Sequence, residues 1–175
     1  KKVKLINRKK NSGQGAALKI GIRAALKNKS DIIVTFDADG QHRASDVKKF
    51  IKKIGAGYDV VLGSRFLEKT KLPIGRKIIL KGSVLVERIL IGIKLTDAHN
   101  GFRAFSDKAA GKIKIKEFGM AHASEIVYQI KKNELKYAEV PVTIEYSADT
   151  LEKGGNTIKR AIKILYRLIK FKFLL

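Results

Sequence analysis

Two aspartates separated by one residue follow an apolar run in the segment DIIVTFDADGQH, residues 31–42. Side chains two positions apart in a strand point the same way, so Asp37 and Asp39 are expected to present their carboxylates together. Such a pair suits a hard divalent cation that bridges protein oxygens and a substrate diphosphate. The competing interpretation is a plain turn, in which Asp, Asp and Gly40 merely end the strand. Residue spacing alone leaves both interpretations open.

The apolar run before the aspartates predicts the strand that positions them. Ile32, Ile33, Val34 and Phe36 are β-branched or aromatic, which is typical of a strand buried on both faces. Ligands of open α/β sheets bind beyond the carboxyl ends of the strands. The aspartates are therefore expected at the rim of a cleft, where a glycine lets the backbone turn.

Alternation and helical periodicity predict the other elements, in which strands and helices alternate along most of the chain. Strands are expected over 3–8, 58–66 and 137–146, and helices within 11–28, 45–57, 76–93 and 122–133. Ser45 is expected to cap the second helix, and Gly55 and Gly57 to end it. Pro141 places the last strand at a sheet edge. This order predicts an α/β layered sheet.

The composition describes one globular domain with a large positive charge. The chain has 175 residues, of which 45% are hydrophobic and 31% charged, so it is long enough to bury a core. The lack of cysteine excludes disulfides and thiolate metal sites, and no apolar run is long enough to span a bilayer. A formal net charge of +22 indicates anionic partners such as nucleic acid, anionic lipid or phosphorylated small molecules. Because Lys1 is not Met, we expect a chain cut from something longer.

Two glycines stand just before the first predicted helix. Gly13 and Gly15 are expected to leave backbone amides free to face a phosphate or ribose. The segment is not a Walker loop, because no Gly-Lys-Ser/Thr follows. A tight strand-to-helix turn explains the same two glycines, so the pattern by itself is a weak signal.

Five segments occur in an order that resembles glycosyltransferases of family two, above all the polyprenol-phosphate sugar synthases of the dolichyl-phosphate mannose synthase type. The segments are NSGQGAAL, DIIVTFDADGQH, DVVLGSRF, TDAHNGFRAF and HASEIVYQIKKNELKYAEVPVTIEY. The resemblance implies a Rossmann-like nucleotide-diphospho-sugar transferase fold. It also implies an inverting enzyme that moves a sugar from a GDP- or UDP-sugar to a polyprenol phosphate. Such an enzyme is expected at the cytoplasmic face of the membrane, peripheral to an anionic surface, with no nucleic-acid partner.

On this resemblance, the DAD segment is the metal motif of the family. Asp39 is expected to ligate Mg²⁺ or Mn²⁺, Asp37 to support the metal or the donor, and Gln41 to complete the shell. The chemical need is that a departing nucleoside diphosphate accumulates negative charge, which a bound cation stabilises. Gly13, Gly15 and Asp37 are therefore expected on the donor side.

The acceptor side follows from two further motifs. Arg65 in GSRF resembles an arginine near the donor diphosphate or acceptor phosphate, and Asp97 resembles an acidic residue near the acceptor. A phosphate acceptor is already anionic, so Asp97 is expected to orient the acceptor or an arginine. Arg103 is expected to pair with Asp97 or to contact phosphate, which makes these three the expected catalytic residues. Arg76 and Lys77 are weaker candidates for the acceptor phosphate. No catalytic role is assigned to His42, His99, His122 and Glu125.

Both ends of the chain depart from the family pattern. The initial strands that end in Pro-x-Tyr/Phe-Asn-Glu and Asp-Asp-Gly-Ser are missing, so the sheet is expected to be truncated at its N-terminus. Residues 1–150 are expected to be a partial catalytic domain, and 151–175 an acceptor loop and a basic amphipathic helix. The apolar and basic stripes of 157–175 predict either a helix lying on an anionic membrane or a terminal helix packed on the sheet.

A glycosyltransferase that uses a different acceptor remains an alternative. Functions of other kinds fit the sequence less well. A haloacid-dehalogenase-like phosphatase also begins its chemistry at Asp-x-Asp-Gly, but here Gln41 and His42 follow and no later acidic pair appears. A nucleic-acid-binding module suits the charge, yet aromatic residues are only 7% and no binding motif is visible. A processive polysaccharide synthase carries Gln-x-x-Arg-Trp, which a chain without tryptophan lacks.

Overall fold

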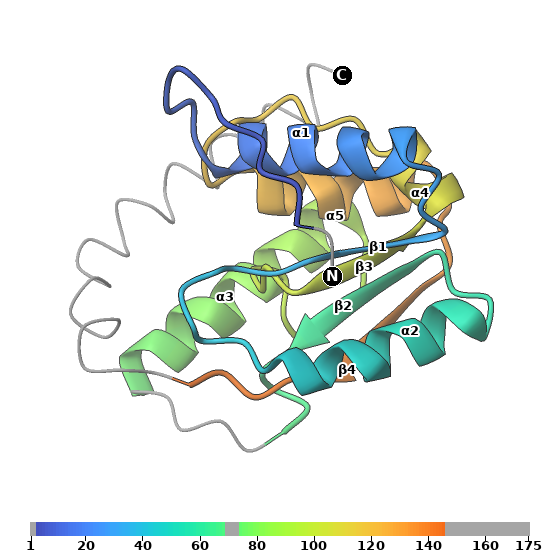
Figure 1. The fold of residues 1–175 in the computed structure, drawn as a ribbon. Helices are drawn as coiled ribbons and strands as arrows, with labels where there is room; N and C mark the ends of the chain where they lie inside the picture. Colours follow the sequence, from blue (N-terminus) through green and yellow to red (C-terminus); the bar gives the residue numbers. More distant parts are fainter. Residues whose placement is uncertain (1–2, 69–73, 146–175) are drawn as a thin grey trace.

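Within the part of the chain that the structure describes, four strands form one mixed sheet in the order β1-β3-β2-β4 (Figure 1). The computed structural model describes residues 3–68 and 74–145. The strands are β1 (Ile32–Thr35), β2 (Val60–Ser64), β3 (Arg103–Ser106) and β4 (Tyr137–Pro141). β3 runs antiparallel to both of its neighbours, and β2 is parallel to β4. The carboxyl ends of β1, β2 and β4 and the start of β3 therefore lie at the same end of the strands. We call this end of the sheet the site edge, as distinct from its two outer strands.

Helices cover both faces of this sheet (Figure 1). They are α1 (Gln14–Lys27), α2 (Val47–Gly55), α3 (Ile74–Ile91), α4 (Asp107–Lys112) and α5 (His122–Lys132). α2 lies on one face, α1, α4 and α5 lie on the other, and α3 packs against α5. The layered α/β arrangement confirms the fold class that the order of elements predicts. Over the ranges that the structure describes, no helix has both the length and the apolarity to cross a bilayer.

Side-chain alternation along β2 separates two hydrophobic cores. Val60 and Leu62 pack in the larger core under α1, α4 and α5. Val61 points to the other face, into a smaller core with Phe50 of α2 and with Phe102. The rings of Phe50 and Phe102 stack with centroids 4.3 Å apart. All five residues of β2 are buried, so burial on both faces belongs to this strand.

Two of the predicted strands differ from the structure. Residues 3–8 form no strand, and Val3 and Leu5 are 92% and 87% exposed, because a strand needs a ladder partner and these residues have none among the described strands. β1 is buried at Ile33 alone, while Phe36 after it is 48% exposed. Burial on both faces was the wrong prediction for β1, because within the described sheet it is an edge strand with a neighbour on one side only.

Local signals place several element ends correctly. α2 ends at Gly55, and Gly57 takes the left-handed conformation (φ 87°) that closes such a helix. β4 is an edge strand, as Pro141 predicts, but it ends at this proline and does not continue beyond it as expected. Ser45 is not the cap of α2, because it lies inside a short 3₁₀ turn, Ala44–Asp46, that precedes the helix. The predicted acceptor loop and terminal helix, 151–175, lie outside the described residues.

Candidate active site at the carboxyl edge of the sheet

A polar loop connects α3 to the start of β3 and lies against the site edge. We call residues 96–101 the site loop; its sequence is TDAHNG. The loop carries Asp97, and it is flanked by Arg65 after β2 and by Asp37 after β1. Because three strand ends meet at this edge, side chains far apart in the sequence come into contact there.

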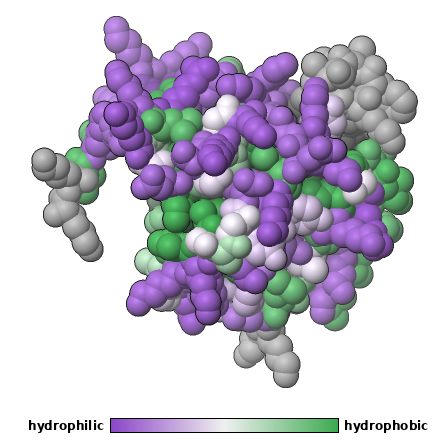
Figure 2. All heavy atoms as spheres, turned by 90° about the vertical axis from the view of Figure 1, so that its right-hand side faces the viewer, coloured by the Kyte–Doolittle hydropathy of each residue, from purple (hydrophilic) through white to green (hydrophobic). Residues whose placement is uncertain are grey.

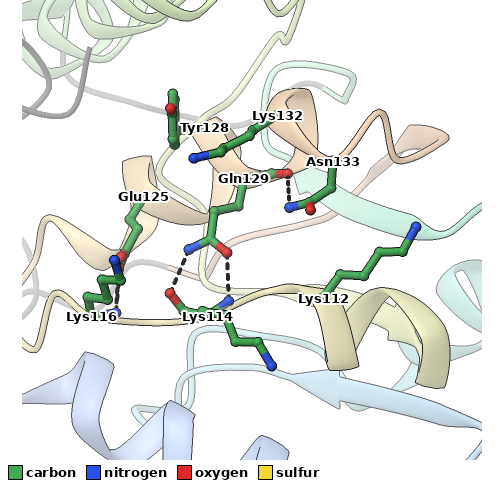
Figure 3. Close-up of a pocket in the computed structure, with 8 residues that line it drawn as sticks. All are labelled: Lys112, Lys114, Lys116, Glu125, Tyr128, Gln129, Lys132 and Asn133. Carbon is green, nitrogen blue, oxygen red and sulfur yellow. Dashed lines mark hydrogen bonds between the residues drawn. The ribbon is translucent and has the colours of Figure 1, made fainter. Parts of the chain in front are cut away.

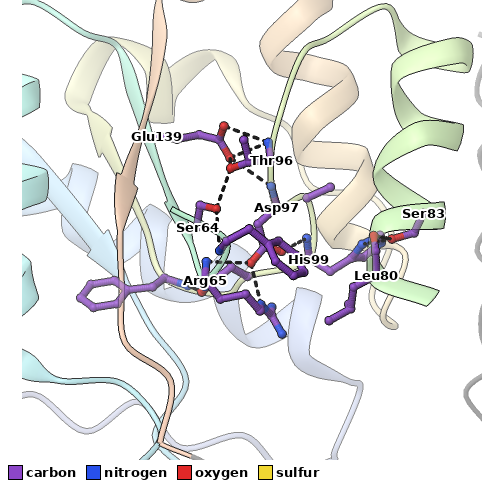
Figure 4. A network of polar contacts seen from close by, with 12 residues as sticks. Ser64, Arg65, Leu80, Ser83, Thr96, Asp97, His99 and Glu139 are labelled. Atoms are coloured by element: carbon purple, nitrogen blue, oxygen red, sulfur yellow. Dashed lines mark hydrogen bonds and ion pairs between the residues drawn. The ribbon is translucent and has the colours of Figure 1, made fainter. Parts of the chain in front are cut away.

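A buried ion pair joins the site loop to the end of β2 (Figure 4). Arg65 Nε donates to Asp97 Oδ2 at 2.6 Å, and the Arg65 backbone N–H donates to the same oxygen at 3.2 Å. Asp97 is only 2% exposed and Arg65 8%. The other carboxylate oxygen, Oδ1, accepts the backbone N–H of His99 at 3.3 Å. Of the orientations expected for Asp97, the structure shows the one in which it orients an arginine.

The first residues of the site loop are fixed by a carboxylate from β4. Glu139 Oε1 and Oε2 accept the backbone N–H of Thr96 at 3.0 and 2.9 Å. Glu139 Oε1 also accepts from Asp97 N at 3.1 Å and from the Thr96 hydroxyl at 2.9 Å. Ser64 Oγ lies 2.6 Å from the same hydroxyl (Figure 4). Burial raises the pKa of Glu139, and these hydrogen bonds oppose that rise.

Arg103 fixes the second half of the loop from inside the core. Its Nε donates to Asn100 O at 2.9 Å, and its two terminal nitrogens donate to Ala98 O at 3.1 Å and Ala123 O at 3.3 Å. The side chain is fully enclosed, and burial lowers the pKa of Arg103 to about 10, although three nearby carboxylates oppose the change. The expected pairing with Asp97 was wrong, because the guanidinium of Arg103 donates its hydrogen bonds to backbone carbonyls. Arg103 therefore holds the site loop in place. Contact between Arg103 and a phosphate stays a prediction that this geometry does not support.

Asp37 has three close neighbours at the site edge. Gln14 Nε2 donates to its Oδ1 at 2.6 Å, and His42 Nε2 lies 3.7 Å from its Oδ2. A Cβ on Gly101 would lie 2.5 Å from Oδ2, so the carboxylate packs directly on the backbone of the site loop. His42 lowers the pKa of Asp37, and burial opposes this effect. The ring of His42 is held edge-on to Phe102, with centroids 5.1 Å apart.

The DAD motif itself is a bend and not a continuation of β1. The strand ends at Thr35, Gly40 has a positive φ of 79°, and Asp39 Oδ1 accepts the backbone N–H of Gln41 at 3.1 Å. Strand alternation therefore does not set the direction of Asp37 and Asp39, and that step of the sequence reasoning was wrong. The turn interpretation is correct for the backbone, and it does not exclude a metal site.

The carboxylates fit a cation that completes its shell with substrate oxygens. In 3–68 and 74–145 no group of three His, Asp or Glu residues gathers closely enough to hold a metal ion. Mg²⁺ is commonly bound through one or two carboxylates plus substrate phosphates. Asp39 is exposed and Asp37 partly exposed, and each oxygen that accepts one hydrogen bond keeps a lone pair. Asp37, Asp39 and Gln41 therefore remain predicted ligands.

Gly13 and Gly15 are explained by close packing. The Gly15 N–H donates to Phe118 O at 3.0 Å, and the Gly13 N–H donates to Asn11 Oδ1 at 2.9 Å. A Cβ would lie 2.3 Å from Phe118 O at Gly13 and 2.2 Å from Glu117 O at Gly15. The expectation of free amides at this turn was wrong, because both amides are bonded within the chain. A donor-binding role for these glycines stays a prediction that their amides do not support.

A buried polar cluster links the site loop to α3 and α5. His99 Nδ1 lies 3.2 Å from Ser83 Oγ, and His99 Nε2 lies 3.5 Å from Glu87 Oε1. Ser124 Oγ donates to the same Glu87 oxygen at 2.6 Å. Burial raises the pKa of Glu87 to about 7 and lowers that of His99 to about 4. Both groups are thus favoured in their neutral forms in the folded chain.

Two more residues without a predicted catalytic role hold a second loop in place. His122 Nδ1 lies 2.7 Å from Gly119 O, and the Glu125 carboxylate accepts the backbone N–H groups of Lys116 at 3.0 Å and Glu117 at 2.9 Å. Arg76 and Lys77 lie in the first turn of α3, where Lys77 is exposed.

Several residues that build the site were missed by sequence reasoning. They are Gln14, Ser64, Thr96, Glu87, Ser124 and Glu139. A signal existed for two of them, since Glu139 stands in an otherwise uncharged strand and Glu87 is the one acidic residue of α3. Buried charged residues need partners, so an acid at an inward position of an element indicates a polar network.

Comparison with known proteins agrees with this architecture. Residues 1–114 match the family described as Glycosyl transferase family 2. The UDP-N-acetylglucosamine–dolichyl-phosphate N-acetylglucosaminyltransferase of Methanococcus voltae is 34% identical over 98% of this chain and 70% of its own length. The dolichol-phosphate mannosyltransferase of Pyrococcus furiosus is 32% identical over 97% of this chain and 49% of its own length.

Solved structures show the same fold. Glucosyl-3-phosphoglycerate synthase from Mycobacterium tuberculosis, in complex with Mn²⁺, UDP and glucosyl-3-phosphoglycerate, superposes with a TM-score of 0.63 at 18% identity. The match covers 89% of this chain and 55% of that one, so the chain spans about half the length of the solved structure. The fold is thus the GT-A-like fold of glycosyltransferases, and the chain belongs to glycosyl transferase family 2.

Proposed function

We propose that this chain is the catalytic part of an inverting glycosyltransferase that moves a sugar from a nucleotide-sugar to a polyprenol phosphate. The observation that carries the proposal is the buried pair that Arg65 forms with Asp97 of the site loop, whose Gly101 packs on the Asp37 carboxylate. The site loop thereby connects a predicted donor side to a predicted acceptor side. The names of the two relatives, a dolichyl-phosphate and a dolichol-phosphate transferase, support this acceptor class.

The donor side needs positive charge against a leaving diphosphate. Asp37, Asp39 and Gln41 would hold Mg²⁺ or Mn²⁺, and the bound cation supplies charge stabilisation of the departing nucleoside diphosphate. Gln14 and His42 position the Asp37 carboxylate and keep it ionised, since His42 lowers its pKa. UDP is the nucleotide named with the Methanococcus voltae relative and with the solved structure, so we propose a UDP-sugar before a GDP-sugar.

The acceptor side needs orientation more than a base. A polyprenol phosphate already carries the negative oxygen that attacks the sugar, so no proton has to be removed. The guanidinium of Arg65 has the planar geometry that matches phosphate oxygens. Asp97, fixed by Glu139 and by the loop backbone, holds that guanidinium in one orientation. We therefore assign Arg65 to phosphate contact and Asp97 to positioning, at a membrane surface whose cytoplasmic side is part of the proposal.

Transfer of labelled sugar to lipid tests the function. The chain is incubated with Mn²⁺, dolichyl phosphate in detergent, and either UDP-N-acetylglucosamine or GDP-mannose, and the label in the organic extract is counted. We expect labelled lipid with the UDP-sugar, and none when 3-phosphoglycerate replaces dolichyl phosphate. Label in 3-phosphoglycerate only contradicts the proposal, as does label in neither acceptor when the initial strands of the family pattern are supplied at the N-terminus.

Metal ligation is tested separately by calorimetry of Mn²⁺ in the presence of UDP. Asp39→Asn removes a ligand and a charge, so we expect at least a tenfold loss of Mn²⁺ affinity, and a smaller loss for Asp37→Asn. Asp31→Asn is the matched control, because Asp31 is exposed at the other end of β1. Equal Mn²⁺ binding by Asp39→Asn and the unmodified chain contradicts the assignment.

A further inference from the structure

The side of α3 that faces away from the protein is unusually apolar. Ile74, Ile78, Leu85 and Ile89 are 78%, 65%, 56% and 67% exposed. Spacings of four, seven and four residues place all four on one stripe of a helix. We call this stripe the outer face of α3. Large apolar side chains that gather on one exposed stripe mark an interaction surface, whereas isolated ones need no explanation.

The same helix carries cations along that stripe and keeps its one acid away from it. Lys77, Lys81 and Arg88 are exposed, with helical positions that flank the outer face on one side. Glu87 is 1% exposed and places no negative charge on the surface, because its carboxylate is buried and accepts a hydrogen bond from Ser124 Oγ. An apolar stripe bordered by Lys and Arg is the pattern of a helix that lies in a lipid interface.

We propose that the outer face of α3 docks this domain on an anionic lipid surface. Charge complementarity selects this occupant, since the chain has a formal net charge of +22 and the cations stand where lipid phosphates would lie. A second copy of the chain would bring the same cations against each other. The segment 157–175 is rich in Lys and Arg and has no acid, so it is equally poor as a cover for this face.

Docking through α3 adds to the proposed function the surface that contacts the membrane. It rests on the proposed function only in taking the acceptor to be a lipid phosphate. The inward side of α3 carries Ser83, which contacts His99 of the site loop (Figure 4). Glu87 contacts the same histidine. One helix therefore joins the lipid-facing stripe to the loop that holds Asp97, and a membrane-bound phosphate would meet the site at the surface where it is anchored.

Three lysines far from α3 in the sequence provide a matched control for the cations of that helix. Lys112, Lys114 and Lys132 line a pocket between α4 and α5 (Figure 3). The Gln129 side chain holds this segment by accepting from Lys114 N at 2.6 Å and donating to Lys114 O at 2.6 Å. All three lysines are exposed. Figure 2 shows hydrophilic side chains over much of the face at the right of Figure 1, where α4 and the start of β1 lie.

Co-sedimentation with vesicles tests the docking surface. The full chain is mixed with vesicles of phosphatidylcholine, or of equal parts phosphatidylcholine and phosphatidylglycerol, without polyprenol phosphate or nucleotide-sugar. We expect binding to the anionic vesicles only, weakened by salt. The double variant Ile78→Ser, Leu85→Ser should bind at least about tenfold more weakly, because two apolar side chains no longer enter the interface. Ile51→Ser, the same kind of change at a 45% exposed position of α2, should bind normally.

The charge arm compares two triple variants with the same net charge. Replacing Lys77, Lys81 and Arg88 by Gln should weaken binding roughly 100-fold, at about 1 kcal/mol for each cation. Replacing the three lysines of the pocket by Gln should have a much smaller effect.

Four outcomes overturn the proposal. Equal losses in the two triple variants would show attraction by net charge alone. Unchanged binding by the Ile78→Ser, Leu85→Ser variant would move the lipid contact elsewhere, including to 157–175. A change in molecular mass of that variant by light scattering without lipid would assign the face to a second copy. No binding by the unmodified chain would reject lipid altogether. None of these outcomes depends on sugar transfer, so this test and the transfer assay fail independently.

Discussion

Replacing Glu87 by Gln changes one buried charge without changing the shape of the side chain. Glu87 lies within the contact between α3 and α5, where Ser124 Oγ donates to its Oε1 and the second oxygen has no hydrogen-bond partner among the described residues. Its neighbour His99 lies 3.5 Å away. A glutamine amide resembles the neutral carboxyl group, so the variant keeps the packing and loses only the titration.

The magnitude follows from the two pKa shifts. Burial raises the pKa of Glu87 from 4.5 to about 7, so the stability that its neutral form contributes is present below pH 4.5 and lost as pH rises to 7, in total about 3 kcal/mol. Burial lowers the pKa of His99 from 6.5 to about 4, so the stability linked to its neutral form increases between those values. The two trends oppose each other in the natural chain. In Glu87→Gln only the second remains.

Urea unfolding followed by circular dichroism measures the effect at pH values from about 5 to 8. We expect the stability of Glu87→Gln relative to the natural chain to increase with pH by up to about 3 kcal/mol across this range. Glu134→Gln, at an exposed position after α5, should show a constant difference. A difference that is independent of pH for Glu87→Gln, or that decreases with pH, would show that Glu87 does not titrate with a raised pKa and would refute the reasoning.

Two further substitutions test the site and its support. Gly15→Ala should lower the unfolding free energy by about 1–3 kcal/mol, because its Cβ would lie 2.2 Å from Glu117 O. Gly21→Ala, in the open part of the same helix, should raise the unfolding free energy by about 0.5–1 kcal/mol. Equal effects of the two substitutions in urea unfolding would argue against close packing at Gly15. Asp97→Asn should cost about 3 kcal/mol of stability, because it removes the carboxylate charge that faces the buried Arg65 guanidinium. It should also slow sugar transfer at least tenfold with UDP affinity nearly unchanged by calorimetry, and a loss of UDP affinity alone would move Asp97 to the donor side.

The sequence by itself determined the features that depend on near neighbours in the chain. Gly57 ends α2 because a left-handed residue closes the helix wherever it stands. Pro141 marks an edge strand because it has no N–H for a ladder bond. The turn at Gly40 was readable for the same reason, whereas the direction of Asp37 and Asp39 was not, because β1 ends at Thr35, before both of them. The layered α/β class followed from the order of such elements.

Only the tertiary structure decided which residues face each other at the site edge. Arg65 pairs with Asp97, 32 positions away, because β2 and the site loop meet there. Arg103 turns to backbone carbonyls and not to that aspartate, because the start of β3 buries it under the loop. Gly15 is required by a carbonyl of residue 117, which no local pattern announces. Contacts between distant segments depend on strand order and on the antiparallel placement of β3, and neither property is a function of residues that are close in sequence.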